Sequence, residues 1–193
     1  ANTLDVKAIT MRKDAIYRHL NTTRFTDMHV LHMLAGIDGR IKLQQTFGAS
    51  TILDVYRPPS AALTVIVQMA PQYEGHSRQV MLTALGVLRR AKIVIVVDDD
   101  IDIHDLQDVM WALSYRVNPA VDIFTLDGMQ GFHLDASTPQ LDEPHRVNLT
   151  GQENNGILGI DATKPSVQKP TERKKFVRAR PMGDGKVFLK DFL

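Results

Sequence analysis

Cysteine is absent from this sequence of 193 residues, and only one tryptophan is present. The lack of cysteine excludes disulfide bonds, thiolate catalysis and cysteine-ligated metals, and it fits a reducing compartment, so we expect a cytoplasmic protein. No apolar run approaches the roughly 20 residues that a helix needs to cross a bilayer, and residues 1–20 lack the apolar segment of a signal peptide. We therefore expect no membrane partner.

A strong excess of either charge is also missing. The formal net charge is +1, which does not indicate a nucleic-acid partner. Hydrophobic residues make up 44% and charged residues 23% of the chain, as in an ordinary globular protein. The length suits about one domain with some excess.

A buried strand is the clearest local signal. Residues 93–97 (IVIVV) are apolar without alternation, which is typical of a strand covered on both faces of a sheet. Helical patterns lie on each side of this run, and other strand-like and helical segments alternate around it. We expect helices at about 26–46, 77–91 and 105–116, and strands at 4–10, 51–55, 63–69, 93–97 and 121–126.

The order of these elements predicts an α/β fold, a Rossmann-like three-layer domain with a mixed, mainly parallel sheet. The link after 51–55 is too short for a crossover helix, so that strand should run antiparallel to 63–69. Strands 63–69, 93–97 and 121–126 should be parallel and joined by right-handed crossovers. An extended C-terminal tail follows the domain.

The helix predicted at about 26–46 carries two glycines. Gly36 and Gly39 weaken it intrinsically, so we expect a close crossing with another element there. Its apolar residues fall on one stripe, which predicts a buried face. That face would consist of Met28, Leu31, Leu34, Ala35 and Ile41.

Four carboxylates follow the buried strand, at Asp98, Asp99, Asp100 and Asp102. Ligands gather at such strand ends in α/β sheets, so a metal site is one interpretation. A calcium loop starting at Asp98 does not fit, because its sixth position is isoleucine and its twelfth is valine. The alternative, which we favour, is that these acids cap the next helix and accept hydrogen bonds from loop amides.

Other candidate sites are weaker. His29 and His32 are spaced to share one helix face, but no third metal ligand accompanies them. The sequence has neither a Gly-x-Gly-x-x-Gly nor a Walker-type phosphate loop. From about residue 163 the chain becomes basic and proline-containing, which indicates a packing or solvated arm or a subunit-docking arm. No aromatic platform accompanies these charges, so nucleic-acid binding is not expected.

Several segments together resemble the UbiD family of decarboxylases. Residues 8–17 (AITMRKDAIY) resemble the family's "ITHRKDPIY" segment, and the run from 95 to 112 resembles "VDDDID…DVMWA". The remaining similar segments are Arg116 to Pro119 ("R-x-x-P"), Gly131 to Leu134 ("GFxL") and Gly159 to Pro165 ("GIDAT(K/R)P").

This resemblance implies reversible, non-oxidative decarboxylation of aromatic or α,β-unsaturated carboxylic acids with prenylated FMN, a divalent metal and potassium. In that family the catalytic arginine and glutamates belong to a flavin-binding domain ahead of the "ITHRKD" segment. We therefore expect no catalytic residue and no metal ligand in this chain, which alone should be inactive, and we expect a homo-oligomer. The corresponding division is 1–22 for the end of the flavin-binding domain or linker, 23–145 for the α/β domain, and 146–193 for loop and basic tail.

The resemblance also suggests residues for the site. The residues that would line the substrate pocket are Met28, His32, Phe132 and Leu134. Some family members place a basic residue near the flavin phosphate at the position of Gly86, and Arg89 or Arg90 would take its place here. The competing hypothesis is a non-catalytic α/β module that binds a ligand or another protein.

Overall fold

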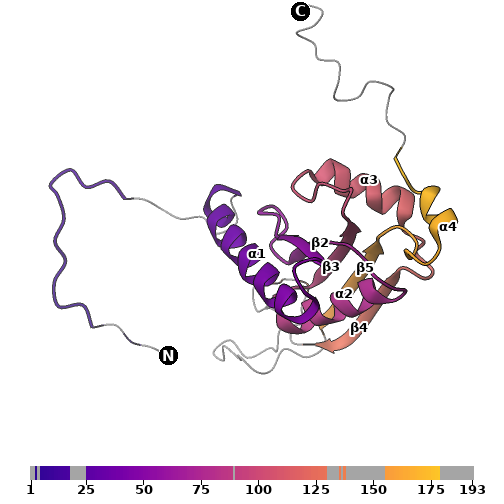
Figure 1. The fold of residues 1–193 in the computed structure, drawn as a ribbon. Coiled ribbons are helices and arrows are strands. Elements are labelled where there is room, and N and C mark those ends of the chain that lie inside the picture. The colour runs from indigo at the N-terminus through magenta and orange to yellow at the C-terminus, as the bar shows by residue number, and fades with distance from the viewer. Residues whose placement is uncertain are drawn as a thin grey trace, which may run out of the picture.

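The computed structural model contains a five-stranded sheet covered by helices (Figure 1) and describes residues 3, 5–17, 25–88, 90–129, 135, 137 and 155–178. The helices are α1 (Phe25–Phe47), α2 (His76–Val87), α3 (Leu106–Arg116) and α4 (Pro170–Lys174). The strands are β1 (Ile52–Tyr56), β2 (Thr64–Met69), β3 (Ile93–Asp98), β4 (Ile123–Met129) and β5 (Asn155–Ala162).

The strand order is β1-β2-β3-β5-β4, and the sheet is mixed. β2, β3 and β5 run parallel, whereas β1 pairs antiparallel with β2 and β4 pairs antiparallel with β5. The α/β fold with a mixed sheet predicted from the sequence is therefore confirmed.

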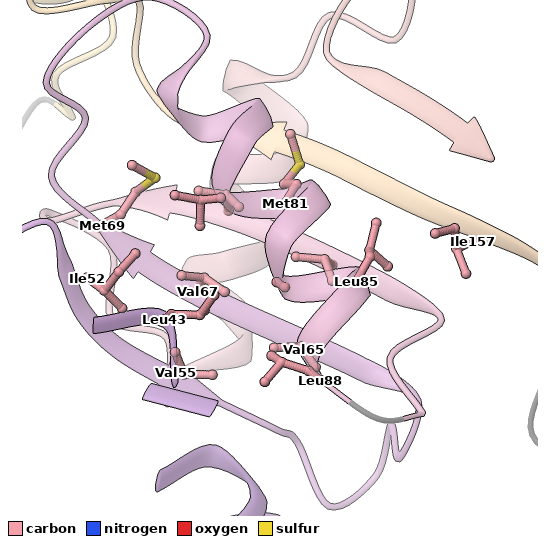
Figure 2. Close-up of a cluster of buried hydrophobic side chains, with 14 residues drawn as sticks. Leu43, Ile52, Val55, Val65, Val67, Met69, Met81, Leu85, Leu88 and Ile157 are labelled. Carbon is pink, nitrogen blue, oxygen red and sulfur yellow. The ribbon is translucent and has the colours of Figure 1, made fainter. Parts of the chain in front are cut away.

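Two apolar clusters cover the two faces of the sheet. Residues of α1, α2 and alternate positions of the strands form the larger cluster, which includes Leu43, Val67 and Met81 (Figure 2). On the opposite face α3 contributes Val109 and Ala112 to a smaller cluster. Because both faces of β3 are covered, its uninterrupted apolar sequence is explained. Four residues of α2 and the residue after it form a buried apolar stripe: Val80, Met81, Ala84, Leu85 and Leu88.

The close crossing expected on α1 is present. A Cβ at Gly36 would lie 2.8 Å from the carbonyl oxygen of Val55, and one at Gly39 would lie 3.3 Å from side-chain carbons of Val55 and Leu88. The predicted buried stripe on α1 was wrong, because Leu31, Leu34 and Ile41 are more than half exposed. The helix packs on β1 through the face that carries Gly36 and Gly39. The larger apolar residues therefore face outward.

Two strand predictions also need correction. Residues 121–126 do not add a parallel strand beside β3, because β5 occupies that place and β4 pairs antiparallel at the sheet edge. β5 was missed because Gly156 and Gly159 interrupt its apolar pattern. At Gly159 the missing side chain makes room for its partner Phe124, since a Cβ there would lie 2.2 Å from the Phe124 ring.

The strand expected at 4–10 is not observed in its described part, residues 5–10, which have no strand partner. The division into 1–22, 23–145 and 146–193 stays a prediction, although the sheet includes β5 beyond residue 145. Among the described residues, no helix is both long and apolar enough to span a membrane.

Candidate functional site

A groove of about 560 Å³ runs along α1 where the helix passes β1. Residues one helical turn apart on α1 form one wall, because side chains at i, i+4 and i+8 share a face. β1 and the loop after β3 form the other wall. The lining residues are His29, His32, Met33, Gly36, Ile37, Arg40, Ile41, Gln44, Asp54, Val55, Tyr56, Arg57, Pro59 and His104.

His32 is the one predicted site residue whose side chain the structure places in this groove. It is 8% exposed, and its Nδ1 lies 3.1 Å from the carbonyl oxygen of Pro58. A carbonyl can only accept, so Nδ1 carries the hydrogen and donates it. Burial lowers the pKa of His32, which favours the neutral ring. In that form Nε2 has a free lone pair and can accept a hydrogen bond.

A second polar group in the groove is centred on Asp54. Its carboxylate lies 3.0 Å from Nε2 of His104 and 3.7 Å from Nη1 of Arg40. The ring of Tyr56 lies against that of His104, with centroids 4.6 Å apart. The acid therefore contacts an imidazole on its own wall of the groove and a guanidinium from the α1 wall.

Arg57 and Arg90 bring positive charge close together. Burial and, secondarily, the charge of Arg90 lower the pKa of the Arg57 guanidinium. Arg90 has a φ of 67°, the one positive value outside glycine among the described residues. A bulky residue adopts this conformation at a cost that surrounding structure must offset, and such strain is frequent at ligand sites.

The acidic strand end has only part of the role expected. Asp98 and Asp102 accept hydrogen bonds from the loop amides of Lys164 and His104, as predicted. The acid that caps α3 is Asp105, whose side chain accepts from the amide of Gln107, so the capping role predicted for Asp98 to Asp102 was wrong. Asp98 is fully buried and binds the amide of Lys164 at 2.5 Å and the guanidinium of Arg173 at 2.5 Å. Burial raises the pKa of Asp98, although both partners favour its charged form.

Asp100 forms the second half of this network. Burial opposes its ionisation, but Arg116, bonded through both terminal nitrogens at 3.0 and 2.7 Å, and Lys164 at 3.2 Å hold its pKa below the usual range. We refer to residues 164–178 as the strap, because they cross the ends of β3 and β5 and are bonded there. The basic segment is thus a packing arm as far as residue 178.

A smaller pocket of about 310 Å³ lies under the strap, next to the start of α2. Ser77 is the second residue of α2 and donates to Asp161, while Gly75 precedes the helix without a side-chain cap. Lys169 pairs with Glu74 in this pocket, Arg116 and Lys164 pair with Asp100 outside it, and Asp161 accepts from the hydroxyl groups of Ser77 and Thr163. In the described part of the chain, no group of three or more histidines and acids is arranged to hold a metal.

Four of the predicted site residues cannot be placed in or outside the groove. Met28 lies on α1, but its side chain lies outside the described residues, as do Phe132, Leu134 and Arg89. Arg40, Asp54 and His104 were missed by sequence reasoning. Arg40 follows His32 by two helical turns, and this spacing was the available signal. His104 had none, since the fold brings it to a carboxylate 50 positions earlier.

Comparison with known proteins adds a family match. Residues 32–162 match the family described as the 3-octaprenyl-4-hydroxybenzoate carboxy-lyase C-terminal domain, UbiD_C. The match begins at His32 in α1 and ends at the last residue of β5, so it includes all five strands and every groove-lining residue except His29.

Solved structures of similar fold agree. The UbiD-class enzyme HmfF from Pelotomaculum thermopropionicum, in complex with FMN, is 26% identical with a TM-score of 0.67, covering 84% of this chain and 34% of that one. The apo 3,4-dihydroxybenzoic acid decarboxylase from Enterobacter cloacae is 25% identical with a TM-score of 0.65, covering 82% and 31%. The vanillic acid decarboxylase of Sedimentibacter hydroxybenzoicus in its open form is 26% identical with a TM-score of 0.61, covering 79% and 30%. This chain spans about a third of their length.

Proposed function

The chain belongs to the UbiD family of carboxy-lyases, and on that premise we propose that it is the C-terminal domain of a reversible, non-oxidative decarboxylase. Its substrates would be aromatic or α,β-unsaturated carboxylic acids, and its cofactor prenylated FMN held with a divalent metal and potassium. The observation that carries this proposal is the groove along α1, where His32 is buried in a fixed orientation. The division into 1–22, 23–145 and 146–193 belongs to the same proposal.

The cationic groups of this chain fit the phosphate end of such a flavin. The charge of Arg90 lowers the pKa of Arg57, so the two guanidinium groups lie near each other and would form a cationic site for a phosphate. Arg90, with Arg89 beside it, would hold the phosphate. The flavin, when bound, would supply an electron sink for the charge that departing carbon dioxide leaves behind.

The residues of the groove would bind and orient the acid. Met33, Ile37 and Tyr56 offer apolar surface to a ring or a conjugated chain. Nε2 of His32 would accept a hydrogen bond from a polar substituent, and the bond from Nδ1 to Pro58 keeps the ring from turning. Met28, Phe132 and Leu134 would complete the wall.

A contact role completes the proposal. The outer face of α1, away from the groove, is apolar and more than half exposed at Val30, Leu31 and Leu34. Contiguous apolar surface of this kind is typical of an interaction site. We propose that this face packs on the flavin-binding domain of the longer protein or on another subunit of a homo-oligomer.

The test is release of carbon dioxide from aromatic and α,β-unsaturated acids by the longer protein loaded with prenylated FMN. We expect turnover by the loaded protein and none by the 193-residue chain alone. Turnover by the chain alone would contradict the assignment of catalysis to another domain. If the loaded protein releases carbon dioxide from neither class of acid, the result would favour the alternative, a non-catalytic α/β module.

A further inference from the structure

The strap, residues 164–178, is attached to the domain without entering either apolar cluster of the described chain. Its helix α4 has no buried residue and lies at the periphery of the domain (Figure 1). Two of its three large apolar side chains, Val167 and Val177, are 44% and 61% exposed, and the third, Phe176, is half-buried. The strap therefore buries little apolar surface on the domain.

Charge pairs hold the strap in place. Four of its cations each contact a carboxylate of the domain: Lys164 with Asp100, Lys169 with Glu74, Arg173 with Asp98, and Arg178 with Asp108. The Asp98 side chain is fully buried, so its pair with Arg173 is the one whose loss costs most. The side chains of Lys169 and Arg178 are 48% and 41% exposed, and exposed pairs contribute little each.

The strap is also one wall of the pocket of about 310 Å³. The opposite wall includes Gly75 and Ser77 at the start of α2 and Asp161 in β5. Ser77 is 7% exposed. Movement of the strap away from the domain would therefore open the pocket to solvent and uncover Ser77. The strap residues that line the pocket are Lys164, Pro165, Ser166, Lys169 and Phe176.

A segment that buries little apolar surface can separate from a folded domain at a lower free energy than global unfolding requires. β3 is the contrasting case, because five of its six residues are buried. Exposing β3 disrupts both apolar clusters. Exposing the pocket requires only the loss of the polar contacts of the strap.

We propose that the strap is a latch that opens as one unit while the rest of the domain stays folded, and that the pair between Arg173 and Asp98 keeps it closed. Opening gives solvent and small molecules access to the pocket between the strap and α2. The inference goes beyond the proposed function and does not depend on it, because no residue of the strap lines the α1 groove.

The absence of cysteine permits a direct test, since a single introduced thiol is the only one in the chain. Ser77→Cys places a thiol in the pocket, and Val80→Cys places one in the larger apolar cluster, about one turn further along α2. Both 193-residue chains are reacted with iodoacetamide at urea concentrations below the unfolding transition. We expect the Ser77→Cys thiol to react at least about tenfold faster and with a smaller dependence on urea, because opening of the strap exposes less surface than unfolding.

Three further substitutions, each combined with Ser77→Cys, identify the strap as the moving part. Arg173→Gln should accelerate the reaction about a hundredfold, because the closed state then keeps Asp98 buried without its cation. Arg178→Gln removes an exposed pair and should accelerate it about two- to fivefold. Lys175→Gln is the control and should leave the rate unchanged, since Lys175 is exposed and has no charge partner among the described residues.

Equal rates and equal urea dependences for the Ser77→Cys and Val80→Cys thiols would show that the pocket opens only on global unfolding, and would overturn the inference. A fast reaction at Ser77→Cys that neither Arg173→Gln nor Arg178→Gln accelerates would also overturn it, because the reagent then enters without movement of the strap. If Arg173→Gln does not fold, the comparison of Arg178→Gln with Lys175→Gln decides.

Discussion

Gly36 lies where α1 crosses β1, and its hydrogen atom is what permits the crossing. A Cβ there would lie 2.8 Å from a backbone oxygen, which cannot turn aside as a side chain can. The same crossing brings His32, one turn earlier, against Pro58. The geometry of the groove thus depends on a residue that contributes no side chain to it.

Gly36→Ala should lower the free energy of unfolding by about 2 kcal/mol, since the helix must move away from β1. The matched control is Gly86→Ala on α2, where a Cβ meets nothing within 4 Å. That variant should be more stable by about 0.5 kcal/mol, because alanine favours the helix. Urea denaturation measures both changes, and equal effects of the two substitutions would show that the contact is not tight.

His76 makes the stability of the chain sensitive to acid. The residue is 4% exposed, stacks on Tyr73, and accepts a hydrogen bond at Nδ1 from the amide of Gln72. Burial lowers its pKa from 6.5, and burial lowers that of His32 as well. A depressed histidine pKa means that stability is fully present above the unfolded value of 6.5 and is lost as the pH falls below it.

We expect the urea midpoint to fall between about pH 7 and about pH 5, and His76→Phe to reduce that fall because the unfolded state then binds one proton fewer. Phenylalanine keeps the packing against Tyr73 and Phe47. The same dependence on pH in both proteins would rule out His76 as a source of the acid sensitivity.

At the scale of elements, the strap is the least expected feature. Its cations are bound to acids at the end of β3, in the loop after it and on α3: Arg173 to Asp98, Lys164 to Asp100, and Arg178 to Asp108. Arg178 also lies 4.1 Å from the centre of the Trp111 ring. The carboxylate cluster and the basic segment, which look like two separate sites in the sequence, form one structural unit.

Arg173→Gln should cost about 3 kcal/mol, because it leaves Asp98 buried without its cation. Adding Asp98→Asn should recover part of this loss, since the remaining group is then neutral. Lys169→Gln, at an exposed pair with Glu74, is the control and should cost less than about 1 kcal/mol.

Trp111 is the only tryptophan, so its fluorescence reports on the strap in the same denaturation series. If Arg173→Gln and Lys169→Gln destabilise equally, the buried pair does not hold the strap.

At the scale of the whole molecule, the sequence predicts a helix or strand correctly where the pattern is local. It fails where the pattern depends on residues that are distant in the chain. β3 was predicted because burial on both faces of the sheet leaves a continuous apolar pattern. β5 was not, because Gly159 is explained only by Phe124 on a neighbouring strand. The α1 stripe was misassigned because the exposed apolar residues of α1 give the same helical pattern as residues of a core.

The candidate site follows the same rule. His32 was found through resemblance of its surroundings to a family, and the structure gives it a bond to Pro58. His104 and Asp54 are unremarkable in the sequence because only the β3–α3 loop brings them together. The contact between His104 and Asp54 arises from the fold and leaves no pattern in the sequence near either residue.

The central claim is that the α1 groove recognises the substrate of a decarboxylase, and substitution of His32 tests it most directly. In the longer protein loaded with prenylated FMN, kcat/KM is measured for 4-hydroxybenzoate and benzoate with the wild type, His32→Leu and the control Lys169→Gln. We predict that His32→Leu changes the ratio of the two kcat/KM values about fivefold or more, as loss of one hydrogen bond to a buried group requires, and that Lys169→Gln leaves it unchanged. An unchanged ratio in a folded, active His32→Leu protein would contradict the account.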